Sequence, residues 1–213
     1  GAGNDTFQGG RRGDFTLDLN IVDYSDALGA ITVDFSGEQS VTGDASIGVD
    51  RLNSIDGIIG TDFADRYTVD EVFFGQHGKY NEFEGRGGDD RIVGNGETLV
   101  SYASAEAAVT VDIGEGTASG DASVGDDVFE GVAGVRGSAF DDLLTGSDND
   151  EDSPDELFEG LAGDDTIDGG TTAFAREVDY SADAGAGGSA GATVDLAAGT
   201  ATDGFGATDT LAN

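Results

Sequence analysis

The chain has 213 residues, of which 37 are glycine and one is proline, and it contains no cysteine, methionine or tryptophan. Its 44 acidic and 9 basic residues leave a formal net charge of −35 at pH 7. The lack of cysteine excludes disulfides and thiolate metal sites, and so acidic a surface repels nucleic-acid phosphates and anionic lipid head groups. We therefore expect hard cations with oxygen ligands, and neither nucleic acid nor insertion into a membrane.

Glycine-rich turns and very short strands alternate from the start of the chain. The opening "GAGNDTFQGG" places glycines before Asp5 and a single apolar residue, Phe7, after it. One apolar side chain between polar neighbours is typical of a very short strand with one face inward, and the glycines favour a turn. The frame of a carboxylate or Asn, any residue, an apolar residue, any residue and Gly starts at Asp5, Asn81, Asp90, Asp127, Asp142, Glu156 and Asp165.

The spacing of these frames indicates a coil. Two pairs of adjacent frames are nine residues apart: Asn81 and Asp90, and Glu156 and Asp165. If consecutive nonapeptides lie on opposite sides of a flattened coil, residues 18 apart stack roughly 4.8 Å from one rung to the next. Asp5 and Asp23 have this spacing, so we expect their carboxylates to face the same gap.

A longer period overlies the short one. The stretch "VDYSDALGAITVDFSGEQSVTGDASIGVD" recurs as "VSYASAEAAVTVDIGEGTASGDASVGDD" and, with a glycine-rich insertion, as "VDYSADAGAGGSAGATVDLAAGTATDG". Tyr24, Tyr102 and Tyr180 mark these copies at intervals of 78 residues. We predict one continuous array: the end of a preceding unit at 1–21, units at 22–99 and 100–177, and a truncated unit at 178–213. On this interpretation the chain is a window from a longer protein.

The stretches between the short frames predict longer rungs. "ITVDF", "VTVDI" and "ATVDL" alternate as half-buried strands do, and "LNSIDGIIG" and "FEGVAGVRG" repeat apolar residues at every third position. These stretches indicate wider coils that need no metal. The expected fold class is all-β, a parallel β-roll or β-solenoid built from nonapeptide-like turns and longer rungs in units of about 78 residues.

The G-G-x-G-x-D-x-U-x pattern of the turns resembles the nonapeptide of the repeats-in-toxin, or hemolysin-type calcium-binding, family. The resemblance is closest in "GAGNDTF", "GRGGDDRI" and "GLAGDDTI", where Ala, Arg or Leu replaces the second glycine of the motif. It implies a parallel β-roll with several Ca²⁺ ions between successive turns, in large proteins that leave the cell by type I secretion and fold outside it.

Carboxylates and the carbonyls of glycine turns suit Ca²⁺, which takes 6–8 oxygens at about 2.3–2.6 Å. The turns at Asp65 and Asp142 depart further from the motif, because Phe63 and Phe140 replace its later glycine. The expected metal-binding residues are Gly1, Gly3, Asn4, Asp5, Asp14, Asp23, Asp65, Asn81, Gly85, Gly88, Asp89, Asp90, Asp142, Asp155, Glu156, Gly160, Gly163, Asp164 and Asp165.

Three other motifs have plainer explanations. Residues 148–159 space their acids like an EF-hand loop, but Ser153 replaces the turn glycine and no flanking helices are evident, which favours a solvated acidic insertion. The cell-attachment tripeptide Arg12-Gly13-Asp14 falls in a candidate metal turn. His77 is the only histidine, and without cysteine it leaves at most one base for a nucleophile, so we expect no catalytic residues.

These patterns favour a structural role over a catalytic one. We expect a calcium-stiffened spacer of an adhesin, surface-layer protein or extracellular fibre, secreted or at the cell surface, with calcium and neighbouring copies or repeats as partners. The alternative is the carboxy-terminal repeat region of a type I-secreted enzyme or toxin whose catalytic domain lies outside this chain. A third hypothesis, a polysaccharide-processing enzyme on a β-helix, requires an aromatic groove and a positioned base, and the sequence has no such cluster.

Overall fold

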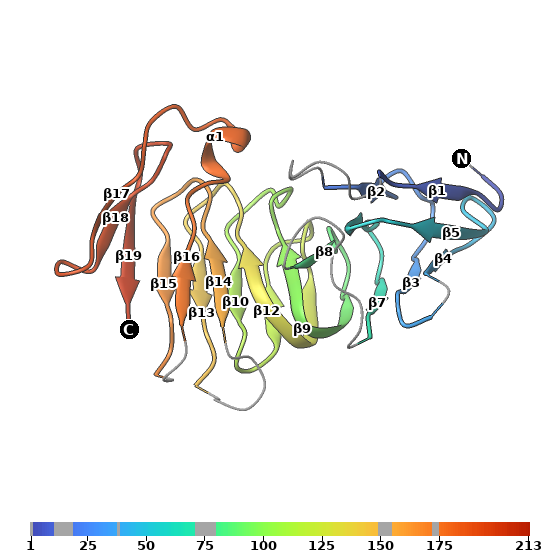
Figure 1. The fold of residues 1–213 in the computed structure, drawn as a ribbon, viewed down its shortest axis with the longest axis horizontal. Coiled ribbons are helices and arrows are strands. Elements are labelled where there is room, and N and C mark those ends of the chain that lie inside the picture. Colours follow the sequence, from blue (N-terminus) through green and yellow to red (C-terminus); the bar gives the residue numbers. More distant parts are fainter. Residues whose placement is uncertain (1, 11–18, 38, 71–79, 149–154, 172–174) are drawn as a thin grey trace.

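The computed structural model describes residues 2–10, 19–37, 39–70, 80–148, 155–171 and 175–213. Over these residues 19 strands form one mostly parallel sheet, and the single helix, α1 (Asp183–Ala186), has four residues (Figure 1). The expectation of an all-β chain is therefore confirmed. The strands are β1 (Thr6–Gln8), β2 (Ile21–Asp23), β3 (Thr32–Asp34), β4 (Ser40–Thr42), β5 (Val49–Asn53), β6 (Gly57–Ile59), β7 (Arg66–Thr68), β8 (Asn81–Glu84), β9 (Arg91–Ser101), β10 (Thr110–Asp112), β11 (Thr117–Ser119), β12 (Asp126–Arg136), β13 (Leu143–Thr145), β14 (Glu156–Glu159), β15 (Thr166–Asp168), β16 (Arg176–Val178), β17 (Thr193–Asp195), β18 (Thr200–Thr202) and β19 (Thr208–Ala212).

Hydrogen bonds join the strands in two runs that share β9 and β12. The first run has the order β1, β5, β4, β3, β7, β9, β12, β11, β10, β13, β15, β19, β18 and β17. The second run has the order β2, β6, β8, β9, β12, β14 and β16. The beginning of each shared strand lies in the first run and its end lies in the second, because both strands are 11 residues long.

Parallel pairing predominates because the chain repeatedly leaves one run, passes through the other and returns one position further along. Three antiparallel meanders interrupt the first run: β3–β4–β5, β10–β11–β12 and β17–β18–β19. Each meander thus places three consecutive strands in the first run.

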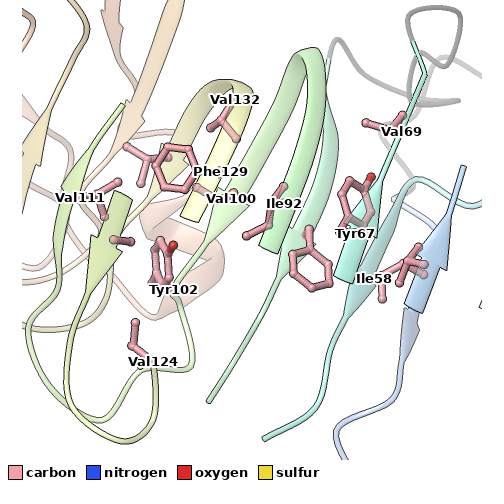
Figure 2. Packing of buried hydrophobic residues seen from close by; sticks show 14 of the residues in the cluster. Ile58, Tyr67, Val69, Ile92, Val100, Tyr102, Val111, Val124, Phe129 and Val132 are labelled. Carbon is pink, nitrogen blue, oxygen red and sulfur yellow. The ribbon is translucent and has the colours of Figure 1, made fainter. Parts of the chain in front are cut away.

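The core is a continuous row of apolar side chains between the two runs. Most three-residue strands bury only their central residue, as Val33, Val111 and Leu144 do, all 0% exposed. Central residues of both runs belong to one hydrophobic cluster, part of which Figure 2 shows. Tyr67 stacks on Phe83 with ring centroids 4.8 Å apart, so an aromatic pair bridges β7 and β8. Burial of the single apolar residue of each short frame therefore stabilises the position of that strand.

The predicted 18-residue stacking distance is wrong for Asp5 and Asp23. The N–H of Asp5 binds Asp50, 45 residues away, whereas Asp23 ends β2 beside β6. Elsewhere, aspartates whose backbone N–H binds the carboxylate of another aspartate are 23, 25, 37 or 44 residues from that partner. The separation varies because a meander adds strands between some of these aspartates but not between others.

Candidate metal centre

Aspartate side chains form hydrogen-bonded ladders across successive rungs. In the first ladder, the N–H of Asp65 donates to Asp90 Oδ1 at 2.8 Å, and the N–H of Asp90 donates to Asp127 Oδ1 at 2.9 Å. The second ladder connects Asp142, Asp165 and Asp209 in the same way, with distances of 2.9 and 3.1 Å. All six residues are at most 3% exposed. Each ladder therefore brings three carboxylates into the low-dielectric interior, where each needs a partner.

A tyrosine hydroxyl ends each ladder. Tyr102 donates to Asp127 Oδ2 at 3.1 Å, and Tyr180 donates to Asp209 Oδ2 at 2.8 Å. Tyr24 makes the equivalent bond to Asp50, whose other oxygen accepts the N–H of Asp5. Both oxygens of these terminal aspartates are thus hydrogen-bonded. The three tyrosines are those that mark the 78-residue period in the sequence.

The opposite end of each ladder lies in a turn that we call a hydroxyl turn, residues 60–65 or 137–142. Asp65 accepts the N–H and the hydroxyl of Thr61 at 2.7 and 2.9 Å, and also the N–H of Ile31. Ser138 and Val109 supply the same three donors to Asp142. The protein itself therefore supplies hydrogen-bond donors to both oxygens of these two carboxylates.

The middle aspartate of each ladder lies in a turn that we call a glycine turn, residues 85–90 or 160–165. The first glycine of the turn leaves room for the carboxylate, because a β-carbon at Gly85 or Gly160 would force Oδ2 of Asp90 or Asp165 to shift, as one at the first glycine of a hydroxyl turn also would. The position that Thr61 or Ser138 has in a hydroxyl turn is taken by Arg86 in one glycine turn and by Leu161 in the other. Both residues have a left-handed backbone (φ 66° and 68°). A further glycine, at 88 or 163, also has positive φ and lies against the backbone of the adjacent hydroxyl turn.

The glycine turns leave one buried oxygen of each aspartate without a donor. Within the described residues, four buried side-chain oxygens lack a hydrogen-bond partner: Asp90 Oδ2, Glu97 Oε2, Asp165 Oδ2 and Asp203 Oδ2. Two of the four belong to the glycine turns, and none belongs to a hydroxyl turn. A positively charged ligand at Asp90 and Asp165 would supply the missing interaction.

Burial and neighbouring negative charges disfavour the ionised form of the aspartates at the glycine turns. Burial, together with the charge of Asp127, raises the pKa of Asp90 to about 9. Burial and the charges of Asp142 and Asp209 raise the pKa of Asp165 to about 8. Burial also raises the pKa of Asp127, to about 7. A cation beside these groups would lower their pKa values and hold them ionised at neutral pH.

In the three turns that fit the calcium motif best, the motif aspartate is Asp5, Asp90 or Asp165. The side chain of the residue just before it accepts a backbone hydrogen bond from the first residue of a neighbouring strand. Asn4, Asp89 and Asp164 accept the N–H groups of Val49, Asp126 and Thr208 at 3.0, 3.1 and 2.7 Å. These three side chains are exposed, and they join neighbouring rungs at the surface. Gly3, just before Asn4, has φ 121° and an open position.

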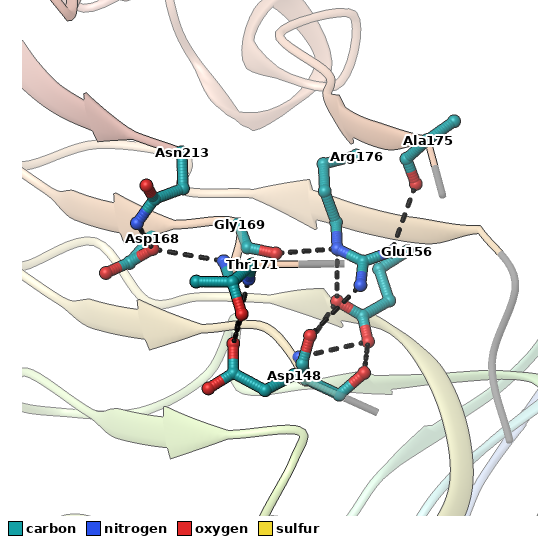
Figure 3. Close-up of polar contacts among 10 residues, drawn as sticks. Asp148, Glu156, Asp168, Gly169, Thr171, Ala175, Arg176 and Asn213 are labelled. Carbon is teal, nitrogen blue, oxygen red and sulfur yellow. Dashed lines mark hydrogen bonds and ion pairs between the residues drawn. The ribbon is translucent and has the colours of Figure 1, made fainter. Parts of the chain in front are cut away.

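Two other predicted ligands already have protein partners. The side-chain oxygen of Asn81 accepts the hydroxyls of Tyr67 and Thr98 in the core. Glu156 is 1% exposed, accepts the hydroxyl of Ser147, and lies 3.0 Å from Nε of Arg176 (Figure 3). An arginine thus neutralises the only predicted glutamate ligand.

Of the remaining predicted ligands, Asp5 is half-buried, and the others are exposed or lie outside the described residues. Asp23 accepts the N–H of Ser25 at the surface, and Asp155 is exposed just before β14. Gly1, Asp14, His77 and the acidic segment 149–154 lie outside the described residues. No group of three or more Asp, Glu or His side chains converges as a metal site over the part of the chain that is described.

Sequence reasoning missed Asp50, Asp209, Thr61 and Ser138 and did not assign Asp127 as a functional residue. The signal for the terminal aspartates was present, because each follows its repeat tyrosine by 25 to 29 residues. The signal for the hydroxyl turns was a Thr or Ser directly after the first glycine of "GTDFAD" and "GSAFDD".

Comparison with models of known protein families gave no match, and comparison with curated proteins gave none. In the described part of the chain, no helix has the length and apolar character needed to cross a membrane.

Proposed function

We propose that this chain is a calcium-binding structural module, a parallel β-roll or β-solenoid in units of about 78 residues. The turns resemble repeats-in-toxin nonapeptides in sequence. Two of the four unpaired carboxylate oxygens support the proposal independently, because they occur in "GRGGDD" and "GLAGDD", two of the three turns that fit the motif best. This coincidence is the observation on which the proposal rests.

Asp90 and Asp165 are the side chains that would hold calcium. The carbonyl oxygens of the glycine turns would supply most of the other ligands, since Ca²⁺ takes 6–8 oxygens and accepts carbonyls readily. The ion would supply positive charge where burial now opposes ionisation. In a chain of net charge −35, it would also reduce the repulsion that opposes compaction. Calcium binding and folding are therefore coupled.

Recurring elements support the repeat unit. The Tyr–Asp hydrogen bond and the antiparallel meander both occur three times, at corresponding places in the predicted units. Units that stack in this way lengthen one rigid array, so each contacts mainly its neighbours. The proposed role is a structural one: a spacer in a secreted adhesin, surface-layer protein or fibre that becomes rigid in the millimolar calcium outside the cell.

The proposal is tested by far-UV circular dichroism during a calcium titration, with magnesium as the control cation. We expect strand signal and thermal stability to rise with millimolar calcium and to change much less with magnesium, which demands a near-octahedral site and dehydrates reluctantly. A spectrum and a melting temperature that calcium leaves unchanged would contradict the proposal.

A further inference from the structure

Each antiparallel meander contains a loop that lies against one of the three turns that contain Asp5, Asp90 and Asp165. We call each such contact between a loop and a turn a junction. The loops are residues 43–48, 120–125 and 203–207. Each leads into a residue whose N–H binds the side chain before the motif aspartate, namely Asn4, Asp89 or Asp164. The three loops therefore occupy equivalent places at three junctions, beside Asp5, Asp90 and Asp165 respectively.

The first two loops bury an apolar side chain at the junction. Ile47 and Val124 are 3% and 1% exposed and belong to the hydrophobic core. Each closes over the glycine that starts its loop, Gly43 or Gly120, where a β-carbon would collide with it. An apolar residue thus fills the space that these loops enclose.

The third loop buries a carboxylate instead. It is one residue shorter, because Thr202 pairs with Thr208 where Ser119 pairs with Asp126. Asp203 starts this loop and is 0% exposed. Its Oδ1 accepts the N–H groups of residues 205–207, whereas its Oδ2 has no partner among the described residues.

The glycine-rich insertion of the third repeat covers this carboxylate. Asp183, at the start of α1, is 3% exposed, and its Oδ2 accepts the N–H of Gly204 at 2.7 Å. The carbonyl of Gly204 accepts the N–H groups of Ser189 and Ala190, so residues 183–190 are bound to the loop. Burial and the charge of Asp203 raise the pKa of Asp183. The end of this loop is bound to the turn of Asp165, because the N–H of Thr208 binds Asp164 at 2.7 Å and the N–H of Asp165 binds Asp209 at 3.1 Å.

We propose that Asp165 and Asp203 together hold one calcium ion at the third junction, and that this site binds calcium more tightly than the turn at Asp90. The inference rests on the proposed function and deepens it. At the second junction the turn of Asp90 adjoins a loop that buries Val124, so among the described residues that site has one unpaired carboxylate and no second. Calcium affinity rises with the number of charged ligands, so the third junction fills first.

Terbium luminescence can assign the two sites, because Tb³⁺ replaces Ca²⁺ and is sensitised by nearby aromatic rings. The chain has no tryptophan, which leaves tyrosine as the strongest sensitiser. Tyr180 binds Asp209 beside the third junction, and Tyr102 binds Asp127 beside the second. We expect a two-phase titration in which Tyr180→Phe removes the emission of the tight phase and Tyr102→Phe removes that of the weak phase.

Calorimetric calcium titration of Asp203→Asn supplies the second arm. We expect the tight phase to weaken on the order of tenfold or more and the weak phase to stay unchanged. Asp121→Asn, which changes an exposed acid in the second loop, is the matched control and should alter neither phase.

Three results would overturn the inference. They are a tight phase that Asp203→Asn leaves intact, a tight phase still sensitised in Tyr180→Phe, and two phases of equal affinity in the unsubstituted chain. None of these outcomes would contradict calcium binding itself. A chain that binds neither Ca²⁺ nor Tb³⁺ overturns the proposed function as well, so the two failures are distinguishable. The tyrosine arm leaves every carboxylate in place, so it remains decisive if Asp203→Asn does not fold.

Discussion

The hydroxyl turns and the glycine turns are neighbours in the same ladders, yet they satisfy a buried aspartate in opposite ways. In a hydroxyl turn, Thr61 or Ser138 gives the carboxylate a backbone and a side-chain donor. In a glycine turn, left-handed Arg86 or Leu161 takes that position, and one carboxylate oxygen stays unpaired. The residue after the first glycine therefore decides how the turn satisfies its aspartate. With Thr or Ser there, protein donors bind both carboxylate oxygens; with Arg or Leu there, one oxygen is left for a cation.

The largest effect should come from removing both glycine-turn carboxylates. At calcium a hundredfold above Kd, two ions should stabilise the unsubstituted chain by about 5 kcal/mol, and Asp90→Asn with Asp165→Asn should abolish nearly all of this gain. Urea unfolding with and without calcium measures it. The matched control, Asp65→Asn with Asp142→Asn, should lower stability in both conditions but keep the calcium gain. Equal calcium gains in the two double variants would remove the distinction between the turns.

The glycine turns should also control how the calcium-free chain responds to pH. The pKa values of Asp90 and Asp165 are raised to about 9 and about 8, above their ordinary value of 3.8. Their contribution to stability is therefore fully present below about pH 4 and is lost as pH rises through these values. Urea midpoints in a chelator should fall between pH 4 and pH 9, less steeply in the variant with Asn at both positions. Because protons compete with the ion, the calcium gain should instead grow with pH.

A smaller effect should follow from filling the space above one glycine-turn carboxylate. Gly85→Ala places a methyl group against Asp90 Oδ2, so we expect weaker calcium binding and a loss of about 1–3 kcal/mol of stability in calcium. Thermal melting in calcium and in chelator measures both. Gly37→Ala is the control, since no described residue outside its chain neighbours lies within 4 Å of a β-carbon there. Equal melting temperatures for Gly85→Ala and the unsubstituted chain would contradict the packing described for this turn.

The smallest effect should come from a hydroxyl turn. Thr61→Ala removes the hydroxyl donor of Asp65 but leaves the N–H groups of residues 61 and 31, so it should cost about 1 kcal/mol. Because this turn needs no ion, the cost should be the same in calcium and in chelator. A loss that calcium repairs would mean that a hydroxyl turn also takes a cation.

The sequence predicts the local structure well, because one apolar residue between polar neighbours settles which side chain a short strand buries. Phe83, Ile92 and Ile167 are buried as the frames predict. The number of residues between hydrogen-bonded aspartates was not predictable in this way, since the meanders pair strands that are distant from the motif turns. For the same reason the second partner of each motif aspartate was missed, as Asp127 and Asp209 reach their ladders only through a meander.

The most direct test of the account is a high-resolution crystal structure grown in millimolar calcium, with calcium located by anomalous scattering. We expect ions about 2.3–2.6 Å from Oδ2 of Asp90 and of Asp165, and none at Asp65 or Asp142. Water at the two glycine turns, or calcium at the hydroxyl turns, would contradict it.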